Sequence, residues 1–249
     1  MTQQARVVLI TGGIGGIGTA MCQRLATDGY RVVANHHPAE QEAADAWRAE
    51  RAAEGLEIDT MGADVSSFDD SARMVADINE RYGAVDVLVN CAGITRDKTF
   101  KRMEQKHWEA VINVNLNSVF NVTRAVWDGM LERGFGRVIN ISSVNGQRGQ
   151  FGQANYATAK AGMHGFTMSL AQEGASKGIT VNTVSPGYVE TAMTLAIRED
   201  VREAIIAGIP MRRMGAPAEI ASAVAFLASD ANAYVTGANI PVNGGLFMH

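Results

Sequence analysis

Ser143, Tyr156 and Lys160 are spaced so that their side chains could share one proton-transfer site. Tyr156 and Lys160 are four positions apart, and on a helix such residues lie on the same face. A free tyrosine titrates near ~10, so proton exchange near neutral pH needs its pKa lowered by roughly 3, or about 4 kcal/mol. A lysine ammonium about 4 Å away supplies about 4 kcal/mol at an effective dielectric constant of ~20. The spacing therefore predicts that Lys160 lowers the pKa of Tyr156.

A serine hydroxyl would complete such a site. Ser143 follows an apolar run at residues 137–141, and open α/β sheets bind ligands at the carboxyl ends of their strands. Its hydroxyl could bind a substrate carbonyl and stabilise the oxyanion that forms as hydride arrives. The Tyr-x-x-x-Lys spacing is also compatible with a packed tyrosine beside a solvated lysine, so the surrounding elements must decide.

Those elements alternate between short apolar strands and amphipathic helices. Uninterrupted apolar strands are typical of a sheet covered on both faces, and strand–helix–strand order implies parallel strands with right-handed crossovers. We therefore expect an α/β fold with a single Rossmann-type doubly wound parallel sheet and helices on both faces. One domain would span residues 1–249, with a lid-like insertion at about residues 190–214. Strands are expected at residues 7–10, 31–34, 58–63, 85–89, 137–141, 179–184 and 238–242, and helices at 19–28, 40–54, 68–82, 106–132, 155–176 and 217–228.

The composition argues against several classes of function. The chain has 249 residues and a formal net charge of −4, whereas nucleic-acid partners favour a basic surface. No apolar run reaches the roughly 18 residues of a membrane span, and the polar residues 1–6 lack a secretory signal. We therefore expect a cytoplasmic protein with neither a nucleic-acid nor a membrane partner. Cys22 and Cys91 are interpreted as buried thiols rather than a disulfide, no metal is expected, and His36–His37 is interpreted as a solvated loop.

A glycine-rich turn at residues 11–18 lies between the first expected strand and the first helix. Glycines at positions 12, 16 and 18 would let the backbone approach a diphosphate, and the following helix N-terminus would offer free N–H groups. The alternative is a tight turn without a ligand. The turn lacks the Gly-Lys-Ser/Thr ending of a nucleoside-triphosphatase loop, which argues against nucleotide hydrolysis.

The end of the second expected strand bears on the choice of cofactor. In this fold an acidic residue there binds the ribose of NAD, but the strand ends in Asn35-His36-His37. The missing carboxylate permits a 2'-phosphate, although no arginine is present there or at Gly15. Glu40 could reach the ribose if the loop folds back. We expect NADPH or NADH, with NADPH favoured.

Together these segments resemble the short-chain dehydrogenase/reductase family. The matching motifs occur in the family's order and extend from Val7 to Gly245. The family's usual second asparagine is Cys91 here, which we interpret as a packing change. The resemblance implies a nicotinamide-dependent oxidoreductase; a non-catalytic nucleotide-binding scaffold, the remote alternative, would need no proton donor. The motifs are Thr11-Gly-x-x-x-Gly16-x-Gly18, Asn90-Cys91-Ala92-Gly93, Asn115, Ser143, Tyr156-x-x-x-Lys160 and Pro186-Gly187.

The resemblance also assigns roles. Tyr156 would be the general acid, Lys160 would hold the nicotinamide ribose, and Ser143 would orient the carbonyl. Asn115 would hold a water that connects Lys160 to solvent. The catalytic residues would thus be Asn115, Ser143, Tyr156 and Lys160. The cofactor would be bound by Gly12, Gly15, Ile17, Gly18, Asn35, Asp64, Val65, Asn90, Ala92, Gly93, Tyr156, Lys160, Pro186, Gly187, Val189 and Thr191.

Four further stretches narrow the resemblance: Gly93-Ile-Thr-Arg-Asp97, Ser142-Ser-Val-Asn-Gly-Gln147, Gly149-Gln-Phe-Gly-Gln153 and Val184-Ser-Pro-Gly-Tyr188. By these the chain most resembles the acetoacetyl-CoA reductases of polyhydroxybutyrate synthesis, which implies an acyl-CoA substrate, an (R)-3-hydroxyl product and a homotetramer. The alternative is a 3-oxoacyl-ACP reductase of fatty-acid synthesis, which shares the stretch at residues 93–97. Phe151 and Tyr188 could also be ordinary loop anchors. The substrate would contact Asp97, Ser143, Gln150, Phe151, Gln153, Tyr156 and Tyr188. Candidates for the CoA phosphates, none of them assigned, are Arg96, Lys98, Arg102, Arg148, Arg212 and Arg213.

Overall fold

Seven parallel strands form one sheet in the computed structural model, which describes residues 5–248. The spatial order is β3-β2-β1-β4-β5-β6-β7, so the winding reverses between β1 and β4, the point where doubly wound sheets bind ligands. The expected fold and the seven strands are confirmed. The strands are β1 (Val7–Ile10), β2 (Arg31–His36), β3 (Ile58–Gly62), β4 (Val85–Asn90), β5 (Gly136–Ile141), β6 (Ile179–Pro186) and β7 (Asn239–Val242).

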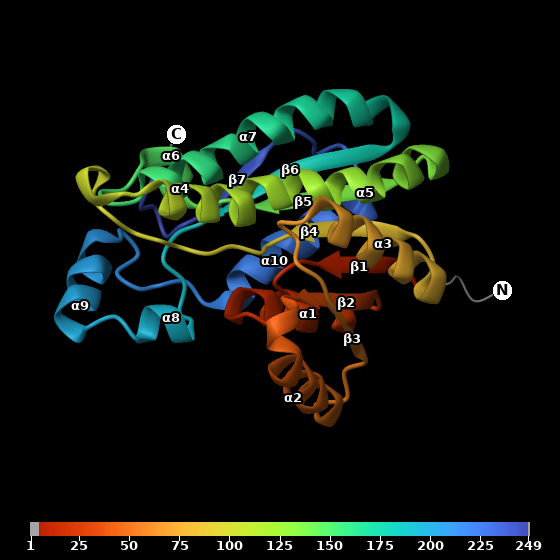
Figure 1. Ribbon diagram of the computed structural model, residues 1–249, viewed down its shortest axis with the longest axis horizontal. Helices are drawn as coiled ribbons and strands as arrows, with labels where there is room; N and C mark the ends of the chain where they lie inside the picture. The colour runs from red at the N-terminus through yellow and green to blue at the C-terminus, as the bar shows by residue number, and fades with distance from the viewer. Residues whose placement is uncertain (1–4, 249) are drawn as a thin grey trace.

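Helices cover both faces of the sheet (Figure 1). Alternate side chains of each strand enter two separate cores, so that in β1 Val8 and Ile10 pack with α1 and α10, and Val7 and Leu9 pack with α3 and α5. This two-sided burial explains why the strands are apolar throughout. One layer contains α1 (Gly16–Thr27), α2 (Gln41–Ala53) and α10 (Pro217–Ala228), and the other contains α3 (Phe68–Tyr82), α5 (Ser118–Arg133) and α7 (Ala154–Gly174).

The prediction of a single helix at residues 106–132 is wrong. The chain instead forms α4 (Gln105–Ile112), a π-helical turn (Asn113–Asn117) and α5. Apolar residues continue at helical intervals through the break, so their spacing could not reveal it. Turns of this kind insert one residue into a helix and are frequent at functional sites.

After β6 the chain leaves the strand–helix rhythm. Two short helices, α8 (Ala192–Leu195) and α9 (Glu199–Gly208), lie beside the main body of the sheet (Figure 1). Short helices also occupy other connections: η1 (Pro38–Glu40), η2 (Phe100–Arg102), α6 (Val144–Arg148), η4 (Ala175–Lys177) and η5 (Asp230–Asn232). Closure of residues 190–214 as a lid stays a prediction.

One expectation about the histidines is wrong. His36 ends β2 and is 1 % exposed rather than solvated, whereas His37 is exposed. Cys22 and Cys91 are free thiols, as expected, but only Cys22 is buried, whereas Cys91 is half-buried. Within residues 5–248 no helix is long and apolar enough to cross a membrane, and no cluster of three metal-binding side chains occurs. Residues 1–4, which belong to the polar N-terminal segment, lie outside the described part of the chain.

Candidate active site

The structure brings Ser143, Tyr156 and Lys160 together at the carboxyl end of β5. Ser143 is the N-cap of α6, immediately after the strand, and α7 presents Tyr156 and Lys160 one turn apart. The side chains of Ser143 and Tyr156 are hydrogen-bonded. The Lys160 ammonium lies 5.6 Å from the centre of the Tyr156 ring and donates to the Ile141 carbonyl at 2.8 Å. The alternative, a packed tyrosine beside a solvated lysine, is therefore excluded for this pair, since Lys160 is only 3 % exposed.

The predicted direction of the tyrosine pKa is wrong for the protein's own groups. Burial raises the pKa of Tyr156, and its hydrogen bond with Ser143 only partly opposes this. Lys160 is itself buried, and this desolvation lowers its pKa from 10.5 to about 8. Near neutral pH the tyrosine is therefore protonated, which suits a group that donates a proton.

Asn115 is held inside the π-helical turn. It is fully buried, its Oδ1 accepts from the Ile94 N–H at 2.8 Å, and its Nδ2 donates to the Ile94 carbonyl at 3.0 Å. A Cβ on Gly93 would lie 3.5 Å from Lys160 Nζ and 3.6 Å from the Asn115 amide. The side chain thus fixes the loop after β4 against Lys160, and its role in a water relay stays a prediction.

The glycine-rich turn connects β1 to α1 with little space for side chains. Gly12 has φ +63°, and a Cβ there would lie 3.0 Å from the Ala92 backbone; on Gly18 a Cβ would lie 2.3 Å from the Gly12 carbonyl oxygen. Thr11 Oγ1 accepts from the N–H groups of Cys91 and Ala92, at 2.9 and 3.0 Å. Helix α1 has no side-chain cap and no acidic residue in its first turn, so its free N–H groups suit a diphosphate.

Two segments complete the predicted cofactor cleft. Near the adenosine end, Val65 is fixed by its carbonyl, which accepts from Asn121 Nδ2 at 3.0 Å, and Asp64 accepts from the Ser66 N–H at 2.9 Å. Asn90 Nδ2 donates to Asn140 at 2.9 Å within the sheet.

At the predicted nicotinamide end, residues 186–191 leave β6 towards the glycine turn. Gly187 packs so closely that a Cβ would lie 2.8 Å from Asn243 Cα, and Val189 is buried. Thr191 caps α8, and a Cβ on Gly16 would lie 3.0 Å from its methyl group. The predicted cofactor residues thus lie along one continuous edge of the sheet.

The predicted substrate residues divide into an ordered and an exposed group. Gln153 Oε1 accepts from Asn145 Nδ2 at 2.9 Å, and its Nε2 donates to Asp97 at 2.8 Å. Phe151 is 86 % exposed, so it is not the packed loop anchor of the alternative interpretation. Gln150 is exposed beside it, and its Oε1 accepts from Arg148 at 3.4 Å.

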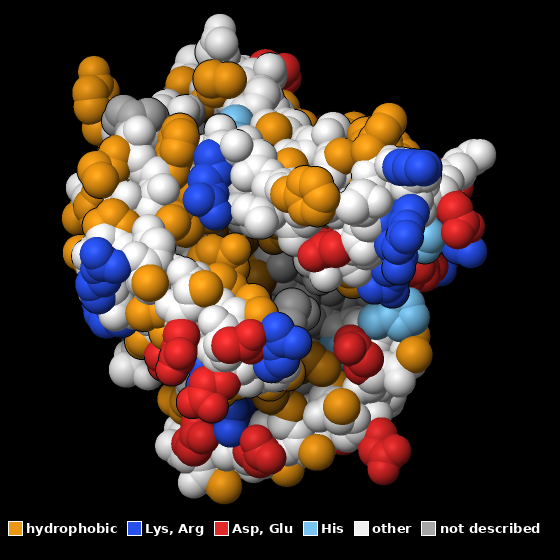
Figure 2. Space-filling model, turned by 90° about the vertical axis from the view of Figure 1, so that its left-hand side faces the viewer, with side chains coloured by type: hydrophobic (Ala, Val, Ile, Leu, Met, Phe, Trp, Pro, Cys, Tyr) orange, Lys and Arg blue, Asp and Glu red, His pale blue; other side chains and the backbone are white. Residues whose placement is uncertain are grey.

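Tyr188 lines a cavity of about 290 Å³ with Met211, Arg213 and Gly244. Arg213 donates to both carboxylate oxygens of Glu219, at 2.7 Å each, so that guanidinium is already paired. The side of the molecule that carries α8 and α9 is hollowed at its centre, and both Lys or Arg and Asp or Glu side chains surround the hollow (Figure 2).

Sequence reasoning missed two buried asparagines. Asn155 precedes the tyrosine; its Nδ2 donates to the carbonyls of Arg96 and His107, and its Oδ1 accepts from the Tyr156 N–H at 2.8 Å. Asn145 positions Gln153. Both lie within two residues of a motif residue, in the first turn of a helix. A polar residue in that first turn is the only sequence feature that could have indicated them.

The model of the short chain dehydrogenase family matches residues 6–202, and the chain belongs to that family. An acetoacetyl-CoA reductase of Allochromatium vinosum is 76 % identical over 98 % of this chain and 100 % of its own length. One from Cupriavidus necator is 54 % identical, with both chains fully covered. A 3-oxoacyl-[acyl-carrier-protein] reductase of Vibrio cholerae is 44 % identical, again with full coverage of both.

Proposed function

We propose that the protein reduces acetoacetyl-CoA to (R)-3-hydroxybutyryl-CoA, with hydride from a nicotinamide cofactor, in polyhydroxybutyrate synthesis. The observation that carries this is the Ser143–Tyr156–Lys160 constellation in a chain 76 % identical to an acetoacetyl-CoA reductase along its whole length. The same relatives argue against a scaffold without catalysis.

The cofactor, when bound, supplies the hydride. The α1 N-terminus and glycine turn would hold its diphosphate, Asp64 and Val65 its adenine, and residues 186–191 its nicotinamide. The tight backbone of Gly12 and Gly18 and the uncapped start of α1 fit that group.

The protein's own residues handle the carbonyl and the proton. Ser143 Oγ donates to the substrate carbonyl oxygen and stabilises the charge that develops on it. Tyr156, kept protonated by burial, gives its proton to that oxygen. Lys160 has further N–H donors besides the one that binds Ile141, and these can stabilise the phenolate that remains.

Replacement of Tyr156 by phenylalanine tests the catalytic assignment. The variant keeps the ring in place and removes only the proton donor, so the rate of acetoacetyl-CoA reduction should fall by about 10²-fold or more, while cofactor binding persists. Unchanged ketone reduction would refute the assignment.

The carrier of the acyl group separates the proposal from its alternative, a 3-oxoacyl-ACP reductase. Gln150, Phe151, Gln153 and Tyr188 would contact the acetoacetyl and pantetheine part. We expect faster turnover of acetoacetyl-CoA than of a long 3-oxoacyl-ACP; the reverse order would favour the alternative.

We also propose a homotetramer in the cytoplasm. Phe120 of α5 is 50 % exposed and stacks on Phe68 of α3, itself 49 % exposed, with the ring centroids 6.1 Å apart; adjacent exposed apolar side chains of this kind mark surfaces that partners bury. Light scattering of the purified protein would measure the mass of the assembly, and cell fractionation its location.

A further inference from the structure

We infer that the protein selects NADH over NADPH, and that Glu40 is the residue that binds the adenosine ribose. This inference rests on the proposed use of a nicotinamide cofactor. It concerns the ribose corner, which we define as the space at the end of β2 bounded by Gly12 and Gly13, residues 35–40, and Asp64.

The glycine turn and the end of β2 are in direct contact. The Gly13 N–H donates to the Asn35 carbonyl at 2.8 Å, and a Cβ on Gly13 would lie 2.6 Å from the Ala34 methyl group. A dinucleotide whose diphosphate lies on the glycine turn therefore has its adenosine ribose beside residues 35–40. In this fold an acidic residue at that place accepts hydrogen bonds from the ribose hydroxyls of NAD.

Asn35 cannot be that residue. Its Nδ2 donates to the carbonyls of Met61 and Ala63, at 3.2 and 3.1 Å, and its Oδ1 accepts from the Gly12 N–H at 3.4 Å. It is 2 % exposed. The amide therefore ties three backbone segments together and has no surface to offer a ribose.

Glu40 returns a carboxylate to the end of β2. From the sequence, Glu40 reaches the ribose only if the loop after β2 folds back, and η1 does fold back. Glu40 Oε2 accepts from the His37 N–H at 3.1 Å, and His37 Nδ1 accepts from the Ala39 N–H at 3.2 Å. This reciprocal cap holds the carboxylate one residue beyond the strand. Glu40 is exposed, and a carboxylate has about four acceptor sites, so hydroxyls can still bind it.

The charge around the corner disfavours a 2'-phosphate. The segments 11–19, 35–47 and 62–72 contain no Lys or Arg. A phosphate monoester, with a charge of about −2, would need a guanidinium or ammonium partner there. It would instead meet carboxylates, which the three segments supply at Glu40, Glu42, Asp45, Asp64, Asp69 and Asp70.

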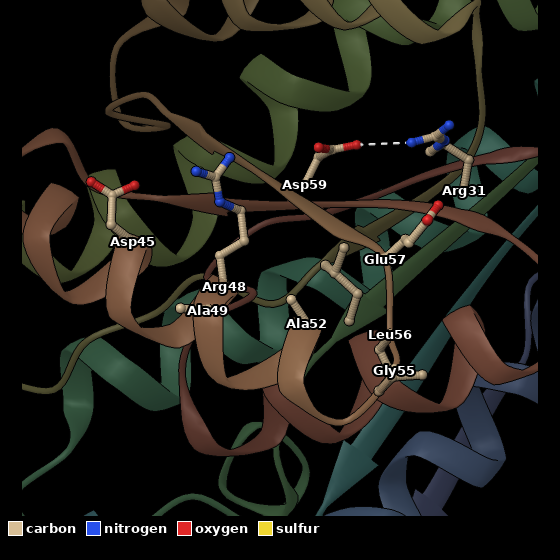
Figure 3. A pocket seen from close by; sticks show the side chains of 10 residues that line it. Arg31, Asp45, Arg48, Ala49, Ala52, Gly55, Leu56, Glu57 and Asp59 are labelled. Atoms are coloured by element: carbon tan, nitrogen blue, oxygen red, sulfur yellow. Dashed lines mark hydrogen bonds and ion pairs between the residues drawn. The ribbon is translucent and has the colours of Figure 1, made fainter.

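Two of the neighbouring cations are paired with carboxylates, and a third lines a different hollow. Arg31 and Arg48 line a separate hollow of about 680 Å³ between α2 and β3, where Arg31 pairs with Asp59 at 3.1 Å (Figure 3). Arg73 is paired with Asp70. The two histidines offer less than a guanidinium: His36 is buried with its Nδ1 on the His37 carbonyl, at 2.9 Å, and His37, whose Nδ1 accepts from the Ala39 N–H, keeps a single ring N–H to donate.

Calorimetric titration of the full chain with NADH and with NADPH, without substrate, tests the inference. The dissociation constant should be at least about tenfold lower for NADH, since a charge-assisted hydrogen bond is worth about that factor. 5'-AMP and adenosine 2',5'-bisphosphate, which differ only in the 2'-phosphate, should show the same order, which assigns the preference to the ribose corner. Because no ketone is turned over, a wrong proposed substrate leaves this result unaffected.

A matched pair of variants tests Glu40 itself. Glu40→Gln keeps an acceptor for the His37 N–H but removes the charge, so NADH binding should weaken about tenfold and NADPH binding should strengthen. Glu42→Gln removes a neighbouring exposed charge from the first turn of α2 and should leave NADH binding unchanged. Tighter binding of NADPH than of NADH by the wild type would overturn the selectivity. Equal changes in the two variants would overturn the role of Glu40.

Discussion

Lys160→Met should stabilise the fold while it removes activity. The substitution keeps an unbranched side chain of similar length but removes a cation that burial holds at a pKa of about 8, against an ordinary value of 10.5. That difference corresponds to about 3 kcal/mol of unfavourable free energy for the charged form at pH 7. Methionine also leaves the Ile141 carbonyl without the 2.8 Å hydrogen bond, which costs about 1–3 kcal/mol. At pH 7 the variant should therefore be up to about 2 kcal/mol more stable than the wild type.

The pH dependence gives the sharper test. Because the folded pKa lies below the unfolded value, the unfolded chain binds more protons between about pH 8 and 10.5. The unfavourable free energy of the buried ammonium is fully present below pH 8 and disappears as the pH rises from about 8 to 10.5. Relative to the variant, the free energy of unfolding of the wild type should rise by about 2 kcal/mol between pH 7 and about 9.5.

Urea unfolding, followed by tryptophan fluorescence at one fixed protein concentration, measures both free energies. Their difference cancels the titration of all other groups. A difference that stays constant from pH 7 to 9.5 would refute the reasoning, because Lys160 would then titrate alike in the folded and unfolded chains.

Three further predictions concern the same region. The kcat/KM for acetoacetyl-CoA should fall above about pH 8 as Lys160 loses its charge, and a pH–rate profile of the free enzyme would measure this; a flat profile to pH 9.5 would contradict it. Asn155→Ala removes three hydrogen bonds at the start of α7 and should lower the free energy of unfolding by about 2 kcal/mol or more. It should also reduce kcat more than it raises KM. An unchanged melting temperature would argue against Asn155 as the residue that fixes the start of α7. Gly18→Ala places a Cβ 2.3 Å from a backbone oxygen and should cost about 1–3 kcal/mol of stability, whereas Gly15→Ala, with its nearest atom at 3.4 Å, should cost less than about 1 kcal/mol; equal losses in denaturant unfolding would refute the packing argument.

Features of the fold and the site could be predicted from the sequence where they depend only on residues close together in the chain. The strands could be predicted because burial on both faces leaves uninterrupted apolar runs such as Val7–Ile10. Ser143, Tyr156 and Lys160 could be predicted to meet because helical spacing and the end of a strand are local properties.

The errors come from tertiary burial. The helical spacing predicts that Lys160 lowers the pKa of Tyr156, but the surroundings that bury both groups come from the end of β5 and the loop after β4. The polarity of His36 predicts a solvated side chain, yet this residue ends β2 and packs against Gly62 of β3. The position of Glu40 depends on η1, which folds back through hydrogen bonds that no apolar pattern reports.

The π-helical turn at Asn113–Asn117 constrains which insertions and deletions this chain can tolerate. Such a turn accommodates one residue more than a regular helix, so deletion of one residue there would restore a regular helix and leave α4 and α5 in register. The face of α5 that carries Val122, Val126 and Met130 into the core would keep its place against the sheet. The same deletion would withdraw Asn115 from the Ile94 backbone. A deletion within α5 itself would instead turn that face by about 100°. The extra residue of the turn is therefore required by the site, whereas the core would accept the chain without it.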